Sequence, residues 1–343
     1  MIKKEKPALS EYTNGRFVGT SYACIDGSGS IITAYDGFAD KENDIKVDEN
    51  TIFPACSISK FITALCVMIE NDKGVIDIDK PVNLYLTGWK LLTPEGNESD
   101  ATVRSLLCHV AGVVDGEDGF YGLRRTDPIV SLIDILEGKS SYNDRPARAE
   151  RQQGEEFEYS DVGYCVLQLM LEEITKKPYE DIAKAYIFDP LNLKHTFFAS
   201  VDNVKHYEKN NVMALGYDDN GSLIPGKYPQ VPDLAASGLW STPTELLMIA
   251  REFVNACKGN SSLLTKESAL EMIRPHEKFS WTGLGVFMGG ENEIVSQGWG
   301  ENGQSMLKLN YSTGETAVVM TNQNPGVDQK ESGIEALVNE SFT

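Results

Sequence analysis

One run of the 343-residue sequence constrains the fold more than any other. Residues 53–69 are almost uninterrupted in apolar character and carry Ser57 and Lys60 near their start, and residues 71–74 (Asn-Asp-Lys-Gly) end the run. A run of this length with apolar side chains on every face predicts a buried helix packed on a sheet rather than an edge strand. In that helix Ser57 is expected in the first turn, with Lys60 one turn later on the same face. The run therefore predicts an amine beside a hydroxyl.

The chemistry that such a pair supports is nucleophilic acyl transfer. A serine hydroxyl is a weak nucleophile near neutral pH and needs a neighbour that accepts its proton. Burial among apolar side chains lowers the pKa of a lysine toward that role, and the free N–H groups at a helix N-terminus favour negative charge on a substrate oxygen. The plainer interpretation makes Ser57 a helix cap and Lys60 a solvated side chain.

A second Ser-x-x-Lys pair, Ser305 and Lys308, shows how weak this motif is alone. It lies in residues 304–309, where polar and apolar residues alternate as in a strand. The side chains of Ser305 and Lys308 are therefore expected on opposite faces. Only the first copy is predicted to bring its serine and lysine together.

Strand-like patterns stand at both ends of the chain, with helical patterns between them. Residues 17–25 and 30–35 flank the turn sequence of residues 26–29 (Asp-Gly-Ser-Gly) and predict a hairpin. Further strands are expected over residues 283–288, 304–311 and 315–321. Helices are expected over residues 102–109, 128–136, 162–174, 179–187, 242–257 and 332–342.

This arrangement predicts an α/β (α+β) fold: an antiparallel sheet flanked by helices, built from both termini, with a mostly helical inserted domain. Residues 1–80 and 270–343 are assigned to the α/β domain and residues 81–269 to the inserted domain, with the active site between them. The length is ample for a sizeable core.

Charge restricts the binding partners. The chain has 31 basic and 51 acidic residues, a formal net charge of −20. Such a surface repels nucleic acid and anionic membranes but tolerates a neutral or cationic small molecule. The plainer interpretation is that the acidity keeps the protein soluble. We expect a small-molecule or short-peptide substrate and neither a nucleic acid nor a membrane as partner; the sequence does not define an oligomeric state.

The six cysteines form no Cys-x-x-Cys pair and stand mostly in apolar contexts, which predicts buried free thiols in a reducing compartment. Residues 1–7 include basic residues without a following apolar core, so no signal peptide is predicted, and no later stretch reaches transmembrane length. The expected location is the cytoplasm, although a trimmed secreted protein would show the same pattern.

Four blocks in order, residues 53–64, 102–112, 154–164 and 236–245, resemble those of the serine β-lactamase and penicillin-binding-protein-like family, in its class C branch. The similarity extends from about residue 17 to residue 340. That branch includes β-lactamases, D,D-peptidases, D-aminopeptidases and esterases. Each block is weak alone, and the ordered set carries the resemblance. It implies the β-lactamase/transpeptidase-like fold and makes Ser57 and Lys60 catalytic.

The resemblance implies a second active-site box, Tyr-x-Asn, which matches Tyr159-Ser160-Asp161. The family's tyrosine faces the nucleophile, where a phenol acts as general base or passes the proton to the leaving group. The alternative is that Tyr159 is an aromatic residue at a helix entry. Asp161 stands where Asn is common, and a carboxylate only accepts hydrogen bonds. It is expected to bind Lys60 or a substrate ammonium; pairing with Lys60 would raise the lysine pKa and shift the base role to Tyr159.

The family's third box, Lys-Thr-Gly in β-lactamases, maps best to Trp299-Gly300-Glu301. The resemblance makes the N–H groups of Ser57 and Asn302 the oxyanion hole. Trp299 replaces a cation that would anchor a β-lactam carboxylate, and Glu301 replaces a glycine that lets the substrate approach the strand. The candidate substrate-binding residues are Asp161, Trp299, Gly300, Glu301 and Asn302.

Three glycines, Gly298, Gly300 and Gly303, leave the register of this box open by a residue or two. They also spell the dinucleotide-binding pattern Gly-x-Gly-x-x-Gly, but a strand rather than a helix is expected after them, so that function is set aside. The four histidines lack metal-ligand spacing, and His109 is interpreted as structural. No Gly-x-Ser-x-Gly elbow is present for an α/β-hydrolase.

The predicted function is a serine hydrolase that acts through an acyl-enzyme on an ester or amide, without a metal or organic cofactor. The altered boxes favour a β-lactamase-related esterase or a D-amino acid amidase or peptidase. The alternatives are a catalytically weak family member that serves as a binding or regulatory protein, a true β-lactamase, and an enzyme that transfers the acyl group to an amine or alcohol.

Overall fold

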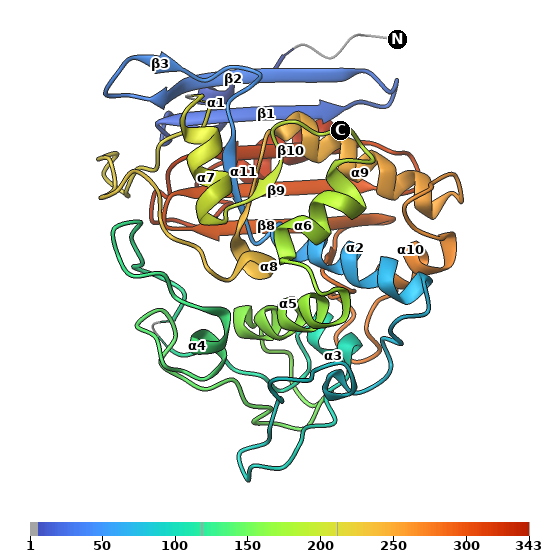
Figure 1. The fold of residues 1–343 in the computed structure, drawn as a ribbon. Coiled ribbons are helices and arrows are strands. Elements are labelled where there is room, and N and C mark those ends of the chain that lie inside the picture. The colour runs from blue at the N-terminus through green and yellow to red at the C-terminus, as the bar shows by residue number, and fades with distance from the viewer. Residues whose placement is uncertain (1–5, 118, 211, 343) are drawn as a thin grey trace.

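A seven-stranded antiparallel sheet built from both ends of the chain organises the molecule (Figure 1). The computed structural model describes residues 6–117, 119–210 and 212–342. The strand order is β3-β2-β1-β10-β9-β8-β7. The strands are β1 (Gly19–Ile25), β2 (Ile31–Asp40), β3 (Ile45–Lys46), β7 (Phe287–Met288), β8 (Glu293–Gly300), β9 (Gly303–Asn310) and β10 (Thr316–Thr321). Since β1 pairs with β10, the two ends of the chain share one sheet, as predicted.

The predicted hairpin is confirmed. β1 and β2 pair antiparallel from Gly19 opposite Gly37 to Ile25 opposite Ile31. The carboxylate of Asp26 accepts hydrogen bonds from the N–H groups of Ser28 and Ser30, which fixes the turn between the strands.

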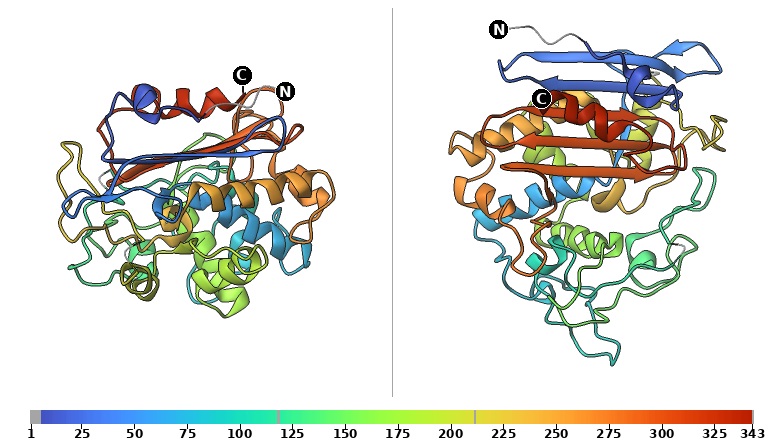
Figure 2. Two further views of the ribbon diagram at one scale, coloured as in Figure 1. Left: turned by 90° about the horizontal axis from the view of Figure 1, so that it is seen from above. Right: turned by 180° about the vertical axis from the view of Figure 1, so that it is seen from behind.

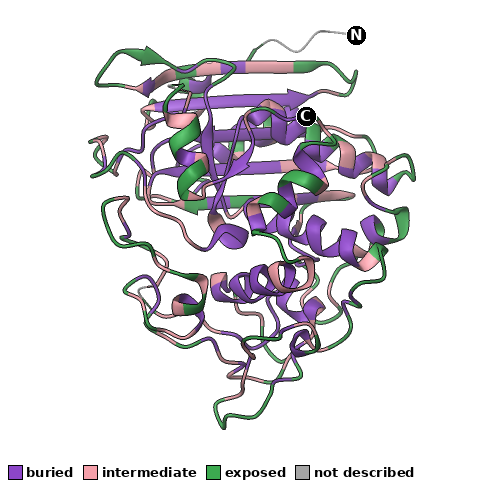
Figure 3. Cartoon of the chain, viewed as in Figure 1, coloured by how far each residue is buried: buried purple, intermediate pink, exposed green. Residues whose placement is uncertain are grey.

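Helices cover both faces of this sheet (Figure 2). On one face lie α1 (Leu9–Thr13) and α11 (Ile334–Asn339), which contact each other. On the other face α9 (Pro243–Cys257) packs on β1 and β10, and α2 (Ser59–Asp72) lies beyond it. All residues of α2 from Ser59 to Glu70 are buried, and Figure 3 shows this helix and β1 as buried almost throughout. The apolar run of residues 53–69 is thus a core helix from Ser59 onward, because no face of that part meets solvent, while residues 53–56 form the strand β4.

A second layer of helices lies beneath α2. It is organised around α5 (Asp161–Thr175), which contacts α2 and the short α3 (Val103–Leu107) and α4 (Leu132–Leu136). The remaining helices are α6 (Tyr179–Ala183), α7 (Val201–Glu208), α8 (Leu234–Ser237), α10 (Lys266–Met272), a π-helix (Lys184–Phe188) and two 3-10 turns (Val82–Leu84, Glu340–Phe342). Each predicted helix is present, and most are shorter than predicted. For example, Thr102 and Thr242 were predicted as the first helical residues, but they are the N-caps that precede α3 and α9.

Several elements lie where the sequence pattern indicated nothing regular, among them α7, α8, α10 and β8, and a small sheet in the order β4-β6-β5 includes β4, which the sequence predicted as the start of a helix. The small sheet comprises β4 (Phe53–Cys56), β5 (Phe197–Phe198) and β6 (Leu239–Ser241). β8 contains two glycines and a glutamine, which strand propensity disfavours, and pairing with β9 over its whole length outweighs that preference.

The strand predicted over residues 283–288 is mostly wrong, because only Phe287 and Met288 pair. Gly285 has a φ of +71°, and a Cβ there would lie 2.5 Å from the Cβ of Ala64. The segment turns to pack against α2, which a strand geometry would not permit.

The predicted boundary between residues 1–80 with 270–343 and residues 81–269 stays a prediction. α9, from the second of these parts, nevertheless lies directly on the sheet. All six cysteines are buried and unpaired. Within the described parts of the chain, no helix is both long enough and apolar enough to span a membrane.

Candidate active site

Ser57 lies in the turn that joins β4 to α2. The prediction that it occupies the first helical turn is wrong by two residues, because the N–H of Lys60 bonds the carbonyl of Ser57 (3.1 Å) in a tighter turn and the helix begins at Ser59. Cys56 has a φ of +49°, a left-handed conformation uncommon for a residue other than glycine. Ser59 fixes the turn by donating to the Cys56 carbonyl (2.6 Å) and accepting from the N–H of Leu239 (2.9 Å).

Lys60 brings its amine to the Ser57 hydroxyl from inside the protein. The side chain is 3% exposed, and Nζ lies 3.1 Å from Oγ of Ser57 and 3.0 Å from the carbonyl oxygen of Ala236. Its third partner is the carboxylate of Asp161. Three acceptors match the three donors of an ammonium group. Burial alone would lower the pKa of Lys60, but the Asp161 carboxylate and Tyr159 raise it above its ordinary value.

The structure thus shows one of the two partners expected for Asp161, because its Oδ1 pairs with Lys60. The effect expected of this pairing is also present, because the pKa of Lys60 is raised, whereas burial alone would lower it. Lys60 in the resting protein is a cation that donates to Ser57.

Tyr159 lies beside this pair: Nζ of Lys60 is 4.7 Å from the centroid of its ring, and its hydroxyl is close enough to Ser57 and Lys60 for both to affect its pKa. Burial of the hydroxyl raises its pKa, an effect that the charge of Lys60 only partly offsets. The tyrosine is thus protonated at rest and in that state cannot act as the general base.

His109 holds the Tyr159 ring. The two rings stack with centroids 4.4 Å apart, and Nδ1 of His109 accepts from the N–H of Ser160 (3.1 Å). Burial and the nearby charge of Lys60 lower the pKa of His109 well below its ordinary value. The neutral imidazole positions Tyr159, so the structural interpretation of His109 gains a specific role.

Asp161 is the first residue of α5, and a second carboxylate holds it in place. Asp115 accepts from the N–H groups of Asp161 (2.7 Å) and Val162 (3.0 Å) and from the hydroxyl of Ser160 (2.7 Å). These N–H groups are donors that a helix N-terminus leaves unpaired. Burial and the neighbouring Asp161 raise the pKa of Asp115 to about 6.

A third carboxyl lies deeper. Asp233 is completely buried and accepts a hydrogen bond from Tyr142 (2.6 Å), while its Oδ2 has no partner. Burial and the charge of Asp161 raise the pKa of Asp233 to about 7. Neither Asp115 nor Asp233 was predicted as a site residue from the sequence, because each lies just outside the blocks of residues 102–112 and 236–245. The signal was present for Asp115, which lies beside a glycine in a polar loop.

The end of β8 closes the site on the other side. A Cβ on Gly300 would lie 2.9 Å from Sγ of Cys56, and one on Gly298 would lie 2.3 Å from the carbonyl oxygen of Ala55. The glycines at 298 and 300 therefore let β8 approach the turn that carries Ser57. Burial raises the pKa of the Cys56 thiol to about 12.

Glu301 faces a different partner from the one expected. Its carboxylate accepts from Nη1 of Arg124 (2.5 Å) and from the N–H of Gly122. It thereby ties the β8–β9 hairpin to the loop that follows Asp115. The glycine that allows close approach is thus Gly300, and Glu301 lies after it.

A cavity lies between this hairpin and that loop. Trp299, Gly300, Glu301 and Asn302 line it on one side and Tyr121 and Trp240 on others, with Cys56 and Asp161 at its inner end. Asn302 is 2% exposed, and its Nδ2 has no partner. The predicted substrate-binding residues therefore share one cavity, beside the contacts of Ser57, Lys60 and Tyr159.

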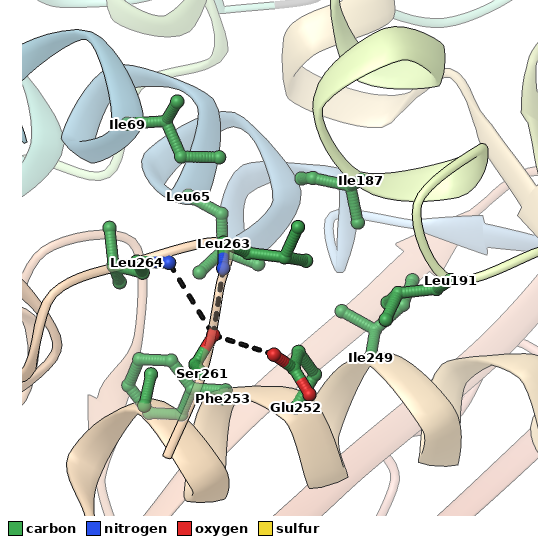
Figure 4. Close-up of a pocket in the computed structure, with 11 residues that line it drawn as sticks. Leu65, Ile69, Ile187, Leu191, Ile249, Glu252, Phe253, Ser261, Leu263 and Leu264 are labelled. Atoms are coloured by element: carbon green, nitrogen blue, oxygen red, sulfur yellow. Dashed lines mark hydrogen bonds between the residues drawn. The ribbon is translucent and has the colours of Figure 1, made fainter. Parts of the chain in front are cut away.

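A second cavity, shown in Figure 4, lies between α2, α9 and the π-helix. Its lining is mostly leucine and isoleucine, and its polar groups, Ser261 and Glu252, bond each other (2.6 Å). No nucleophile faces it, so it is not a candidate active site. Within the described residues no group of three or more His, Cys, Asp or Glu side chains is placed to hold a metal ion.

The comparisons with known proteins agree with this geometry. The family model described as "Beta-lactamase" matches residues 6–339. The protein named "Putative penicillin-binding protein PbpX" of Bacillus subtilis is 30% identical over 220 residues, 64% of this chain and 49% of that protein. Teichoic acid D-alanine hydrolase of Staphylococcus aureus is 27% identical over 240 residues, 69% of this chain and 55% of that protein. The chain thus spans about half the length of these curated relatives.

Solved structures show the same fold. The octameric penicillin-binding protein homologue from Pyrococcus abyssi has a TM-score of 0.78 at 23% identity, over 96% of this chain and 75% of that one. D-amino acid amidase from Ochrobactrum anthropi SV3 has a TM-score of 0.77 at 20% identity, over 97% and 98%. With nearly the whole sequence matched by the family model and the whole fold shared, the chain belongs to the beta-lactamase family.

Proposed function

We propose that this protein is a serine hydrolase in which Ser57 forms an acyl-enzyme with an ester or amide substrate. The observation that carries the proposal is the contact of the Ser57 hydroxyl with both Nζ of Lys60, at 3.1 Å, and the hydroxyl of Tyr159. Membership of a family with relatives named as a hydrolase and an amidase supports it. The carbonyl carbon bonds to Oγ of Ser57, the leaving group departs with a proton, and water then releases the acyl group.

The protonation states of Lys60 and Tyr159 indicate how Ser57 is activated. Lys60 and Tyr159 both carry a proton at rest, because burial raises the pKa of Tyr159 and the Asp161 carboxylate, acting against burial, raises that of Lys60. Neither accepts a proton in that state. In the active form, either Lys60 or Tyr159 has therefore lost its proton, and the deprotonated group accepts the proton of Ser57. Activity is expected to rise with pH.

For the oxyanion hole we favour the nucleophile's own N–H and that of Glu301, one residue before the predicted Asn302. The N–H of Gln304 donates to Oγ1 of Thr321 on β10, and Gln304 lies opposite Trp299. Neighbouring N–H groups alternate between the two sides of an antiparallel strand. The N–H of Trp299 therefore points away from β9, to the open edge of β8, and continuing the same alternation places that of Glu301 on this side; Glu301 and Asn302 form the turn after β8.

The substrate class proposed is an ester or a D-amino acid amide or short peptide rather than a penicillin. The third box contributes no free cation. Trp299 stands where the resemblance expects the lysine, and the nearby Arg124 is paired with the carboxylate of Glu301. A β-lactam carboxylate would lack a partner there. Hydrolysis of nitrocefin far faster than of short-chain p-nitrophenyl esters or D-alanyl amides would contradict this choice.

The direct test of the enzyme is covalent labelling followed by mass spectrometry. A fluorophosphonate or a fluorescent penicillin should add its mass to Ser57, and Ser57→Ala should abolish the addition. The chain supplies a matched control in its second Ser-x-x-Lys pair: Ser305, on β9, donates to the carbonyl of Ala55, and Ser305→Ala should keep full labelling. If no acylating probe reacts, the alternative of a binding or regulatory protein is favoured instead.

A further inference from the structure

A continuous run of aromatic rings leads from Tyr159 to the protein surface. The ring of Phe287 stacks on Tyr159 at 6.4 Å and meets Phe157 at 6.3 Å. Phe157 meets Trp281 at 5.9 Å, and Trp281 meets Phe279 at 5.4 Å. We call Phe157, Phe279, Trp281 and Phe287 the aromatic platform. Three separate chain segments contribute to it, so only the tertiary structure assembles it.

The platform is open to solvent although its members are large and apolar. Trp281 is 50% exposed, and the three phenylalanines are partly exposed. A contiguous patch of large apolar side chains on a solvent-exposed surface is a candidate binding surface. Nζ of Lys278 bonds the carbonyl of Glu155 and lies 5.2 Å from the centroid of the Phe279 ring, while Glu156 pairs with Arg151 at 3.0 Å. The Lys278 ammonium thus already covers Phe279, and the ring faces that the patch offers to a ligand are mainly those of Trp281 and Phe287.

Its position relative to Ser57 identifies which end of a substrate it meets. Acyl transfer requires that a proton reach the departing oxygen or nitrogen, and the group that delivers it must touch that atom. The Tyr159 hydroxyl contacts Ser57, and the platform extends from the Tyr159 ring. The cavity lined by Tyr121 and Asp161 is a separate set of residues and remains for the acyl group. The platform thus adjoins the leaving group.

We propose that the aromatic platform binds a planar, uncharged, apolar leaving group of the substrate. The inference rests on the proposed function of Ser57. In the step concerned, Oγ of Ser57 bonds to the carbonyl carbon, the bond from that carbon to the leaving oxygen breaks, and the alcohol departs with the proton that Ser57 lost. Stacking of a flat leaving group on Phe287 and Trp281 places the scissile bond beside Tyr159.

The test compares esters of one short acyl group with methyl, cyclohexylmethyl and 2-naphthylmethyl leaving groups. These are all primary alkoxides, so the series varies ring contact more than leaving-group basicity. Stacking of one aromatic pair corresponds to about a two- to tenfold change in rate. We expect kcat/KM for the naphthylmethyl ester to exceed that for the cyclohexylmethyl ester, and Trp281→Ala to reduce this preference about fivefold.

Within each variant the methyl ester is the internal control, because it reports on Ser57 without touching the platform. Trp281→Phe should retain most of the preference and Phe287→Leu should lose it. If Ser57 becomes acylated but the naphthylmethyl preference is absent, or survives Trp281→Ala and Phe287→Leu, the platform proposal is overturned and the proposed function stands. If no ester acylates Ser57, both are overturned.

Discussion

At the scale of single residues, Asp161 has the largest chemical consequence. Its carboxylate contacts Nζ of Lys60, a residue that is 3% exposed. A charge in that setting acts strongly, because few solvent dipoles screen it. Asp161 therefore decides how protons are shared among Lys60, Tyr159 and Ser57.

The Asp161→Asn variant should shift the rising limb of the pH profile of kcat/KM to lower pH by about one unit or more. Asp161 raises the pKa of Lys60 and of Tyr159, so its neutralisation lowers both, whichever of them must lose a proton. Hydrolysis rates measured from pH 5 to 10 provide the check. Asp79→Asn, which breaks an ion pair with Arg104, is the control and should leave the limb in place. An unmoved limb in Asp161→Asn would contradict this proton scheme.

Lys60 and Lys308 offer a second prediction with a matched control. Lys60→Ala removes the amine that contacts Ser57 and should lower kcat/KM by on the order of a thousandfold. Lys308 pairs with Glu293 at 2.9 Å on β8 and lies away from the site. Lys308→Ala should stay within about threefold of the parent rate. Equal losses in the two variants, measured with the same ester, would show that Lys60 has no special role.

At the scale of elements, the N-terminus of α5 determines where Tyr159 and Asp161 lie. Asp115→Ala leaves the N–H groups of Asp161 and Val162 without their acceptor, which should cost about 2 kcal/mol of unfolding free energy. It should also lower kcat. Ser131→Ala, at the N-cap of α4, should cost about 1 kcal/mol without affecting kcat. Urea unfolding together with steady-state rates tests both statements; a normal kcat in Asp115→Ala would argue against the positioning role.

The β8–β9 hairpin and the loop after Asp115 are joined by one carboxylate. Glu301→Gln removes the charge that Arg124 and Gly122 share, so the loop should open more often. Because the pair is only partly exposed, amide hydrogen exchange over residues 119–127 should become about tenfold faster. Glu137→Gln, which alters an exposed pair with Lys139, is the control and should leave that exchange unchanged. Unchanged exchange in Glu301→Gln would mean that other contacts hold the loop.

At the scale of the whole molecule, buried acids make stability depend on pH. Burial raises the pKa of Asp233 to about 7 and that of Asp115 to about 6, both above the usual value for the unfolded chain. Between about pH 4 and pH 7 the folded protein therefore holds more protons than the unfolded one, and stability falls as pH rises through this window.

The Asp233→Asn variant should lose less stability than the parent between pH 5 and pH 8. The difference is expected to be about 2 kcal/mol, because Asn keeps an acceptor for Tyr142 and carries no charge. Unfolding free energies from urea titrations at the two pH values give the comparison, in which other titrating groups cancel. Parallel losses in parent and variant would show that Asp233 does not ionise in this range.

The sequence by itself determined the parts that depend on local periodicity. The core helix after Ser57, the hairpin of β1 and β2, and the contribution of both termini to one sheet followed from alternation and apolar runs. The sequence could also propose catalytic residues, namely Ser57, Lys60 and Tyr159, because they lie in blocks that resemble those of a known family in the same order. That Asp161 would bind a cation followed from the fact that a carboxylate can only accept, with Lys60 as one of two partners left open.

Only the tertiary structure decided the rest, because it depends on groups brought together from distant segments. The protonation of Lys60 and Tyr159 results from burial opposed by a neighbouring charge, and no local pattern gives that balance. β8 is a strand because it pairs with β9, in spite of its glycines. The register at Gly300 and the ion pair of Glu301 with Arg124 likewise depend on which backbones approach Cys56 and which loop faces the hairpin.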